Sequence, residues 1–288
     1  MLNENKKRTI REMLNYSLRI LVLLVVWSLI YSIAFEIIIP LTQSQTVSIR
    51  NIFYSAIFGH YHLWYLYVAI GLYLITPILK LFVKTENKKY ITYFLVLSIL
   101  IRFVVPFVNF FCNLFMFEPN WISQYANSFR IVFSHECLTY YVLGWYLTTF
   151  DFKEKTKKLI YILGVVGFLI TFFCSQFFTT ETQKAYSVFY NNGIINILLY
   201  SVALFLFIFS FFKDKELKTK GIIYKLSNLS FGVYAIHVLV LYFAIKYTGG
   251  IEHNSFRLVV EYISTTVFSF LISYLLSKVP LLKKIIRA

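Results

Sequence analysis

The chain has 288 residues, of which 59% are hydrophobic and 14% charged, whereas soluble domains have about 45–50% apolar and about 25% charged residues. With a mean hydropathy of +0.68, this composition excludes soluble domains, a disordered chain, a collagen and a small disulfide-rich secreted protein. The formal net charge of +15 does not predict a nucleic-acid partner, because the basic residues lie in short runs between apolar segments. The remaining class is an all-α protein that crosses a lipid bilayer several times.

A bilayer core about 30 Å thick requires about 20 apolar residues of helix. About eight segments meet this requirement, and the first is too long for the apolar part of a signal peptide. We therefore predict about eight transmembrane helices, near residues 13–36, 62–83, 89–112, 131–150, 158–178, 191–212, 226–247 and 256–278.

The linkers alternate in charge along the chain. Lysine and arginine gather before the first segment, in every second linker and at the end of the chain. The linkers 37–61, 113–130, 179–190 and 248–255 are poor in both. Because basic loops stay on the cytoplasmic side, this alternation predicts a multi-pass protein of the plasma membrane with both termini in the cytoplasm.

The three cysteines, Cys112, Cys137 and Cys174, are far apart and odd in number. Their spacing matches no metal site, so we predict that they fill space in helices and bind no metal.

Two ionisable residues are predicted within the bilayer, where a charge is costly and calls for a partner. Arg102 lies about 13 residues into the third segment, or about 20 Å of helix rise from its cytoplasmic end, and His237 lies at a similar depth in the seventh. Glu136 is the first candidate to pair with Arg102 and Glu261 the second. Pro106, one turn beyond Arg102, is expected to kink the helix and free a carbonyl group.

All five histidines fall in the outer half of the membrane or on its outer face, at positions 60, 62, 135, 237 and 253. One interpretation is structural: histidines at helix ends lie at the membrane–water interface, and the aliphatic side chain of Arg102 extends outward so that its guanidinium reaches water. The other is a buried polar site in which a histidine accepts a proton and an arginine stabilises an oxyanion. The catalytic candidates are His62, Arg102, His135, Glu136 and His237.

Two sequence motifs are more specific than composition. Residues 60–67 read HYHLWYLY, and residues 226–237 read LSNLSFGVYAIH. Together, in this order, they resemble membrane acyltransferase family 3, the bacterial O-acyltransferases that modify surface polysaccharides and related envelope molecules. The resemblance covers essentially residues 1–288 as one domain.

The resemblance implies an acyl-CoA donor, usually acetyl-CoA, on the cytoplasmic side and a hydroxyl acceptor on a glycan or glycolipid. It also implies basic residues that contact the CoA phosphates. Arg8 and Arg11 have the family's Arg-x-x-Arg spacing, whereas Arg19 better fits the register to Trp27. The positive-inside rule explains these arginines equally well, since basic residues beside a span keep that end of the helix in the cytoplasm.

The chain departs from the family in one respect. Family members have about ten helices, and the first carries an arginine followed eleven positions later by a histidine that is taken as the catalytic base. No arginine here has that spacing. The sequence is therefore expected to begin at the family's third helix and to be inactive alone, either as an N-terminally shortened product or as a diverged member with another role.

Three functions fit these observations. The first is an integral membrane O-acyltransferase acting on a cell-surface polysaccharide or its lipid-linked precursor. The second is a non-catalytic membrane subunit of a polysaccharide assembly complex. The third is a transporter, which would usually place carboxylates near the bilayer midplane; the two aspartates, Asp151 and Asp214, lie in predicted cytoplasmic linkers instead.

Overall fold

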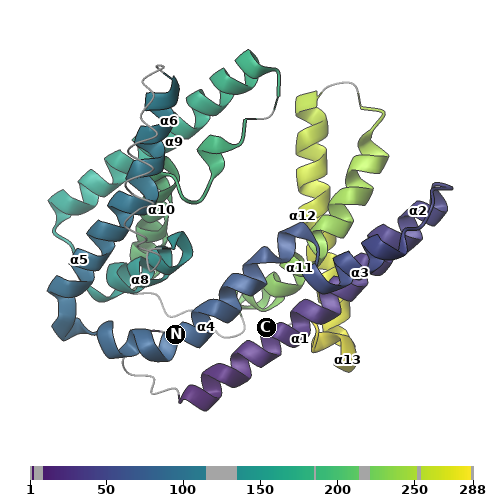
Figure 1. The fold of residues 1–288 in the computed structure, drawn as a ribbon, viewed down its shortest axis with the longest axis horizontal. Coiled ribbons are helices and arrows are strands. Elements are labelled where there is room, and N and C mark those ends of the chain that lie inside the picture. Colours follow the sequence, from purple (N-terminus) through teal and green to yellow (C-terminus); the bar gives the residue numbers. More distant parts are fainter. Residues whose placement is uncertain are drawn as a thin grey trace. The chain divides into compact units, whose positions relative to one another are not determined.

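A computed structural model describes residues 2, 9–114, 135–184, 186–213, 221–251 and 254–286, and no β-strand occurs among them. The predicted residues Arg8, His253 and Asp214 lie outside these ranges. The α-helices are α1 (Ile10–Ser32), α2 (Ile39–Thr42), α3 (Ile49–Phe58), α4 (Trp64–Phe82), α5 (Lys88–Ile99), α6 (Val105–Leu114), α8 (Glu136–Thr149), α9 (Glu154–Thr182), α10 (Ile195–Phe212), α11 (Ile222–Thr248), α12 (Asn254–Lys278) and α13 (Pro280–Lys283) (Figure 1).

The described residues contain seven helices that are long and apolar enough to cross a membrane. They are Ile10–Thr42, Ile49–Phe82, Thr85–Cys112, Glu154–Thr182, Val188–Phe212, Ile222–Thr248 and Asn254–Lys278. The predicted all-α, multi-pass membrane fold is therefore confirmed. Of the predicted segment 131–150, residues 131–134 lie outside the described ranges, and α8 has only 14 residues.

The predicted linker 37–61 is largely helical. The first helix continues through a π-helix, Ile33–Ile38, and α2 to Thr42. After a short connection, Ser48 caps α3 by accepting a hydrogen bond from the Asn51 amide at 3.4 Å. The apolar run Ile37–Ile39 and this capping residue are local reasons for the extra helix.

Two compact units divide the chain. The middle unit comprises Thr76–Glu216 with Met1–Lys7, and the terminal unit comprises Arg8–Ile75 with Leu217–Ala288. Buried side chains of α1, α4 and α11 contribute to the core of the terminal unit, among them Trp27, Leu66 and Ile236. The core of the middle unit includes Phe103, Val142 and Leu198. Each unit therefore has its own apolar core.

Each of the two π-helices among the described residues ends shortly before a proline. Ile33–Ile38 ends two residues before Pro40, and Leu100–Val104 ends two residues before Pro106. Proline cannot donate a backbone hydrogen bond and crowds the carbonyl of the preceding turn. A π-turn accommodates this by widening the helix locally, a distortion that is frequent at functional sites. The kink expected at Pro106 thus takes the form of a π-helix, and Arg102 is part of it.

Two glycines allow α9 and α10 to pack closely. A Cβ atom at Gly164 would overlap the Cβ of Ala203, and one at Gly167 would lie 2.5 Å from the backbone oxygen of Asn196. Small residues at such contacts let membrane helices approach each other. Gly144 of α8 has no atom within 4 Å of the position that a Cβ would occupy.

Gly167→Ala should therefore lower the free energy of unfolding by about 1–3 kcal/mol, the usual cost of overpacking. Gly144→Ala is the matched control, because it adds the same methyl group into open space and should be neutral or stabilising by up to about 1 kcal/mol. Reversible unfolding in mixed detergent micelles, followed by circular dichroism, measures both. Equal effects of the two substitutions would show that the α9–α10 contact is not tight.

Candidate functional site

A histidine group lies in the terminal unit, where the chain passes from α3 to α4. Gly59 follows α3 with φ 73° and ψ 175°, a backbone conformation that is essentially restricted to glycine. His60 is then extended, and Tyr61–Leu63 forms one 3₁₀ turn that leads into α4. This tight connection directs His62 into the core, where the residue is only 6% exposed.

His60 and His62 are hydrogen-bonded to each other. Their Nδ1 atoms are 3.0 Å apart, so one ring must donate a proton and the other must accept it. The Nε2 atom of His62 is buried and has no hydrogen-bond partner among the described residues. The hydrogen-bonding capacity of this buried atom is therefore unsatisfied within the described residues, and the proton shared with His60 decides whether Nε2 can donate or accept.

The second motif meets the first at His62. The Tyr234 hydroxyl of α11 donates to the His62 backbone oxygen at 2.6 Å. The rings of His62 and His237 are perpendicular, with centroids 5.3 Å apart. His237 in turn donates from Nδ1 to the Tyr234 carbonyl at 2.6 Å. Because that nitrogen carries the proton, Nε2 of a neutral His237 ring is an acceptor.

Tyr31 of α1 completes the group. Its ring packs against His60 and His62, with centroid distances of 4.8 and 4.6 Å. Its hydroxyl donates to the Ala235 carbonyl at 2.9 Å. Helices α1 and α11 and the connection before α4 thus hold the three histidine rings together, and this arrangement can transfer a proton. His60 was not among the predicted site residues; its two-residue spacing from His62 is the signal in the sequence.

A second polar group lies in the middle unit. Arg102 donates from Nη2 to Glu136 Oε2 at 2.8 Å, so the first predicted partner of Arg102 is confirmed. The second predicted partner is wrong, because Glu261 belongs to α12 and accepts from Arg257 Nε at 2.8 Å. Thr248 also donates to Glu261 at 2.6 Å. An arginine one turn away on the same helix thus neutralises Glu261 locally.

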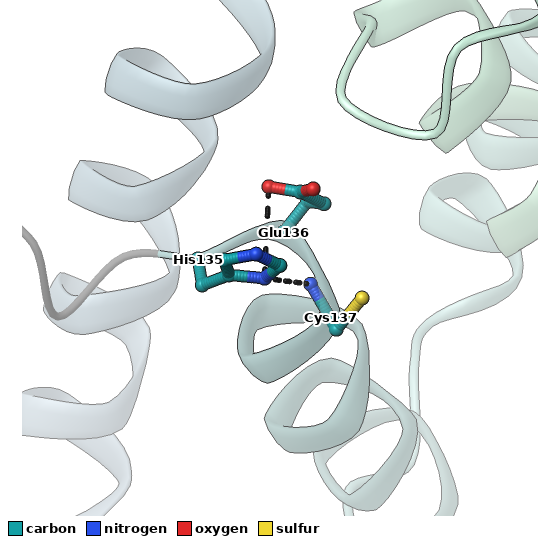
Figure 2. A group of neighbouring side chains, drawn as sticks. All are labelled: His135, Glu136 and Cys137. Atoms are coloured by element: carbon teal, nitrogen blue, oxygen red, sulfur yellow. Dashed lines mark hydrogen bonds and ion pairs between the residues drawn. The ribbon is translucent and has the colours of Figure 1, made fainter. Parts of the chain in front are cut away.

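His135, Glu136 and Cys137 follow one another at the start of α8 (Figure 2). Their nearest ligand atoms all lie within 4.8 Å of one another, as in a metal site. However, His135 Nδ1 accepts from the Cys137 amide at 3.3 Å and so caps the helix. Glu136 is neutralised by Arg102, whose positive charge opposes a second cation. These contacts assign the group to helix capping and ion pairing, and all three cysteines of the chain are free thiols.

The described arginines expected to contact the donor lie on α1. Thr9 and Glu12 form a capping box at its start. Arg11 and Arg19 are both exposed, and their eight-residue separation corresponds to about 12 Å of helix rise. Nothing in this geometry favours one of them over the other.

The predicted catalytic residues thus fall into two groups. His62 and His237 lie together in the terminal unit, and Arg102, His135 and Glu136 lie together in the middle unit.

Comparison with known proteins identifies one family. Residues 2–278 match a family model described as an acyltransferase domain. None of the curated proteins matches the chain. None of the solved structures matches it either.

Proposed function

The chain belongs to membrane acyltransferase family 3, and on that basis we propose that it transfers an acyl group from acyl-CoA to a hydroxyl group of a cell-surface polysaccharide or lipid-linked glycan. Acetyl is the proposed group. The observation that carries the proposal is the match over residues 2–278. The proposed location is the plasma membrane, with both chain termini in the cytoplasm, since the basic linkers alternate with neutral ones.

The histidine group supports this chemistry. In the proposed reaction the acceptor hydroxyl oxygen attacks the thioester carbonyl carbon and its proton passes to Nε2 of His62. The imidazolium keeps its Nδ1 proton and donates it to His60 Nδ1, 3.0 Å away, which stabilises the positive charge. The carbon–sulfur bond then breaks, and the CoA thiolate takes up the proton from His62 Nε2, which restores the neutral imidazole. The site thus needs a neutral His60 ring, because its Nδ1 atom must accept the proton that His62 donates.

Membranes that contain the chain provide the direct test. They are incubated with acetyl-CoA labelled in the acetyl group, and label in the glycan fraction is measured after base treatment, because base releases O-acetyl esters. The 288-residue chain is compared with any upstream in-frame extension that encodes an arginine followed eleven positions later by a histidine. Label with either form supports the proposal. Absence of label with both forms would contradict it and favour the non-catalytic subunit.

Donor binding depends on positive charge, because CoA carries phosphates. The double substitution Arg11→Ala, Arg19→Ala should weaken equilibrium binding of acetyl-CoA to the protein in nanodiscs about tenfold, the effect of losing one charge-assisted contact. Arg50→Ala is the matched control, because Arg50 is also exposed near a helix start but lies in a linker predicted on the other side. If the double variant binds acetyl-CoA as well as the wild type does, these arginines set only the orientation of the helix in the membrane.

A further inference from the structure

A small polar pocket lies within the middle unit, beside the Arg102–Glu136 ion pair. It has a volume of about 450 Å³ and is lined in part by Arg102, Glu136, Ser187, Asn191 and Gly193. This volume falls within the ~300–1,000 Å³ range of small-molecule sites. The histidine group contributes no residue to it, so the pocket requires an explanation of its own.

The walls of the pocket are held by hydrogen bonds. Asn191 accepts from the Gly193 amide through Oδ1 at 2.9 Å. The Tyr140 hydroxyl of α8 donates to the carbonyl of Asn192 at 3.1 Å. On the other side, Arg102 stands in the π-helix Leu100–Val104. The segment after α9 and the distorted helix thus place polar groups around one space before any ligand binds.

The ion pair leaves hydrogen-bonding capacity on both partners. Arg102 donates to Glu136 through Nη2, which uses only part of the donor capacity of the guanidinium. The two side chains are 44% and 22% exposed. A guanidinium has five N–H donors and a carboxylate about four acceptor sites. The pocket therefore offers donors and acceptors side by side.

Charge narrows the ligand class. Glu136 would repel an anionic ligand, and Arg102 would repel a cationic one. Because the two charges are paired, the pocket favours neither sign of ligand charge. A neutral ligand with adjacent hydroxyl groups can accept from the guanidinium and donate to the carboxylate at once. We infer that this pocket binds a neutral sugar unit of the acceptor, an assignment that rests on the proposed acyl transfer to a glycan.

In this assignment Arg102 and Glu136 recognise the acceptor and do not transfer its proton. The test therefore measures binding. The 288-residue chain in nanodiscs is mixed with four neutral disaccharides, maltose, cellobiose, lactose and chitobiose, and with a glucuronic-acid disaccharide. Saturation-transfer difference NMR measures the affinity of each sugar. The wild type should bind at least one neutral disaccharide and should bind it more tightly than the glucuronide.

Glu136→Gln should reverse this preference. Glutamine keeps the size of the side chain but leaves the Arg102 charge uncompensated, so affinity for the neutral sugar should fall about tenfold and affinity for the glucuronide should rise. Asn191→Ala, at another position of the pocket lining, should lower the affinity for the neutral sugar but should not raise the affinity for the glucuronide. Arg257→Gln is the control, because it breaks an ion pair of equal 2.8 Å length in the terminal unit, and it should change neither affinity.

Two results would overturn the inference: a wild type that binds none of the four neutral disaccharides, or a Glu136→Gln variant that keeps the wild-type preference. Neither depends on acyl transfer, so a failed labelling experiment with intact sugar binding would reject the proposed reaction alone. Intact labelling without sugar binding would reject this pocket alone.

Discussion

His62→Ala is expected to lower acyl transfer by about 10²–10⁴-fold, the usual contribution of a general base. The expectation follows from three observations. The residue is 6% exposed, its Nε2 atom has no partner among the described residues, and its Nδ1 atom is hydrogen-bonded to His60. The substitution removes both the unpaired Nε2 atom and the hydrogen-bond partner of His60. The labelling assay, run with whichever form of the chain transfers acetyl, measures the loss.

A second substitution separates proton transfer from positioning. His62→Gln retains hydrogen-bonding groups but cannot act as a base at neutral pH, so it should lose nearly as much activity as His62→Ala. Tyr61→Phe is the control in the same turn, since its ring is 72% exposed, and it should keep near-normal activity. Full activity in His62→Gln would show that His62 only positions its neighbours.

Gly59→Ala is expected to have the second large effect, on stability and on activity together. The conformation at φ 73° and ψ 175° costs a residue with a Cβ about 1–3 kcal/mol. The new Cβ would also lie 2.8 Å from Ser28 Oγ, a buried atom. Any shift that relieves this contact moves His60 and His62, the next residues of the connection. Detergent unfolding and the labelling assay should both record the change.

Two further variants identify the cause. The double substitution Ser28→Ala, Gly59→Ala removes the overlap with Ser28 Oγ but keeps the backbone strain, so it should recover part of the lost stability. Gly71→Ala, in α4 of the same unit, adds a methyl group with no atom within 4 Å and should leave both readouts unchanged. A Gly59→Ala protein as stable as the Gly71→Ala protein would contradict the strain argument.

The helices show which features can be predicted locally. Hydropathy and length predicted the membrane spans because burial in lipid depends on the composition of each segment alone. The same reasoning missed α3. The segment 37–61 was predicted only as a linker between two spans, whereas a capping serine and helical hydrogen bonds satisfy its backbone over Ile49–Phe58.

The candidate site shows the opposite case. The motifs around His62 and His237 were recognisable in the sequence, but their contact spans 172 positions between His62 and Tyr234. No local pattern predicts such a contact, since it depends on how α4 and α11 pack in the terminal unit. Glu136 could be named as the first candidate partner of Arg102 from the predicted depths of the two residues, and the ion pair is present. The partner of Glu261 was not predicted, because Arg257, which binds it, lies one turn away on the same helix, α12.

By itself, the sequence determined the membrane class, most of the spans and the two motifs that indicate the acyltransferase family. Each of these is a property of one segment and its solvent. Only the tertiary structure decided that three histidines lie together next to Tyr31. It alone also decided that Arg102 and Glu136 line a pocket of the middle unit and that Gly59 sets the turn from α3 to His60. Those features depend on side chains from distant segments packed within a few ångströms, where distance and direction set the energy.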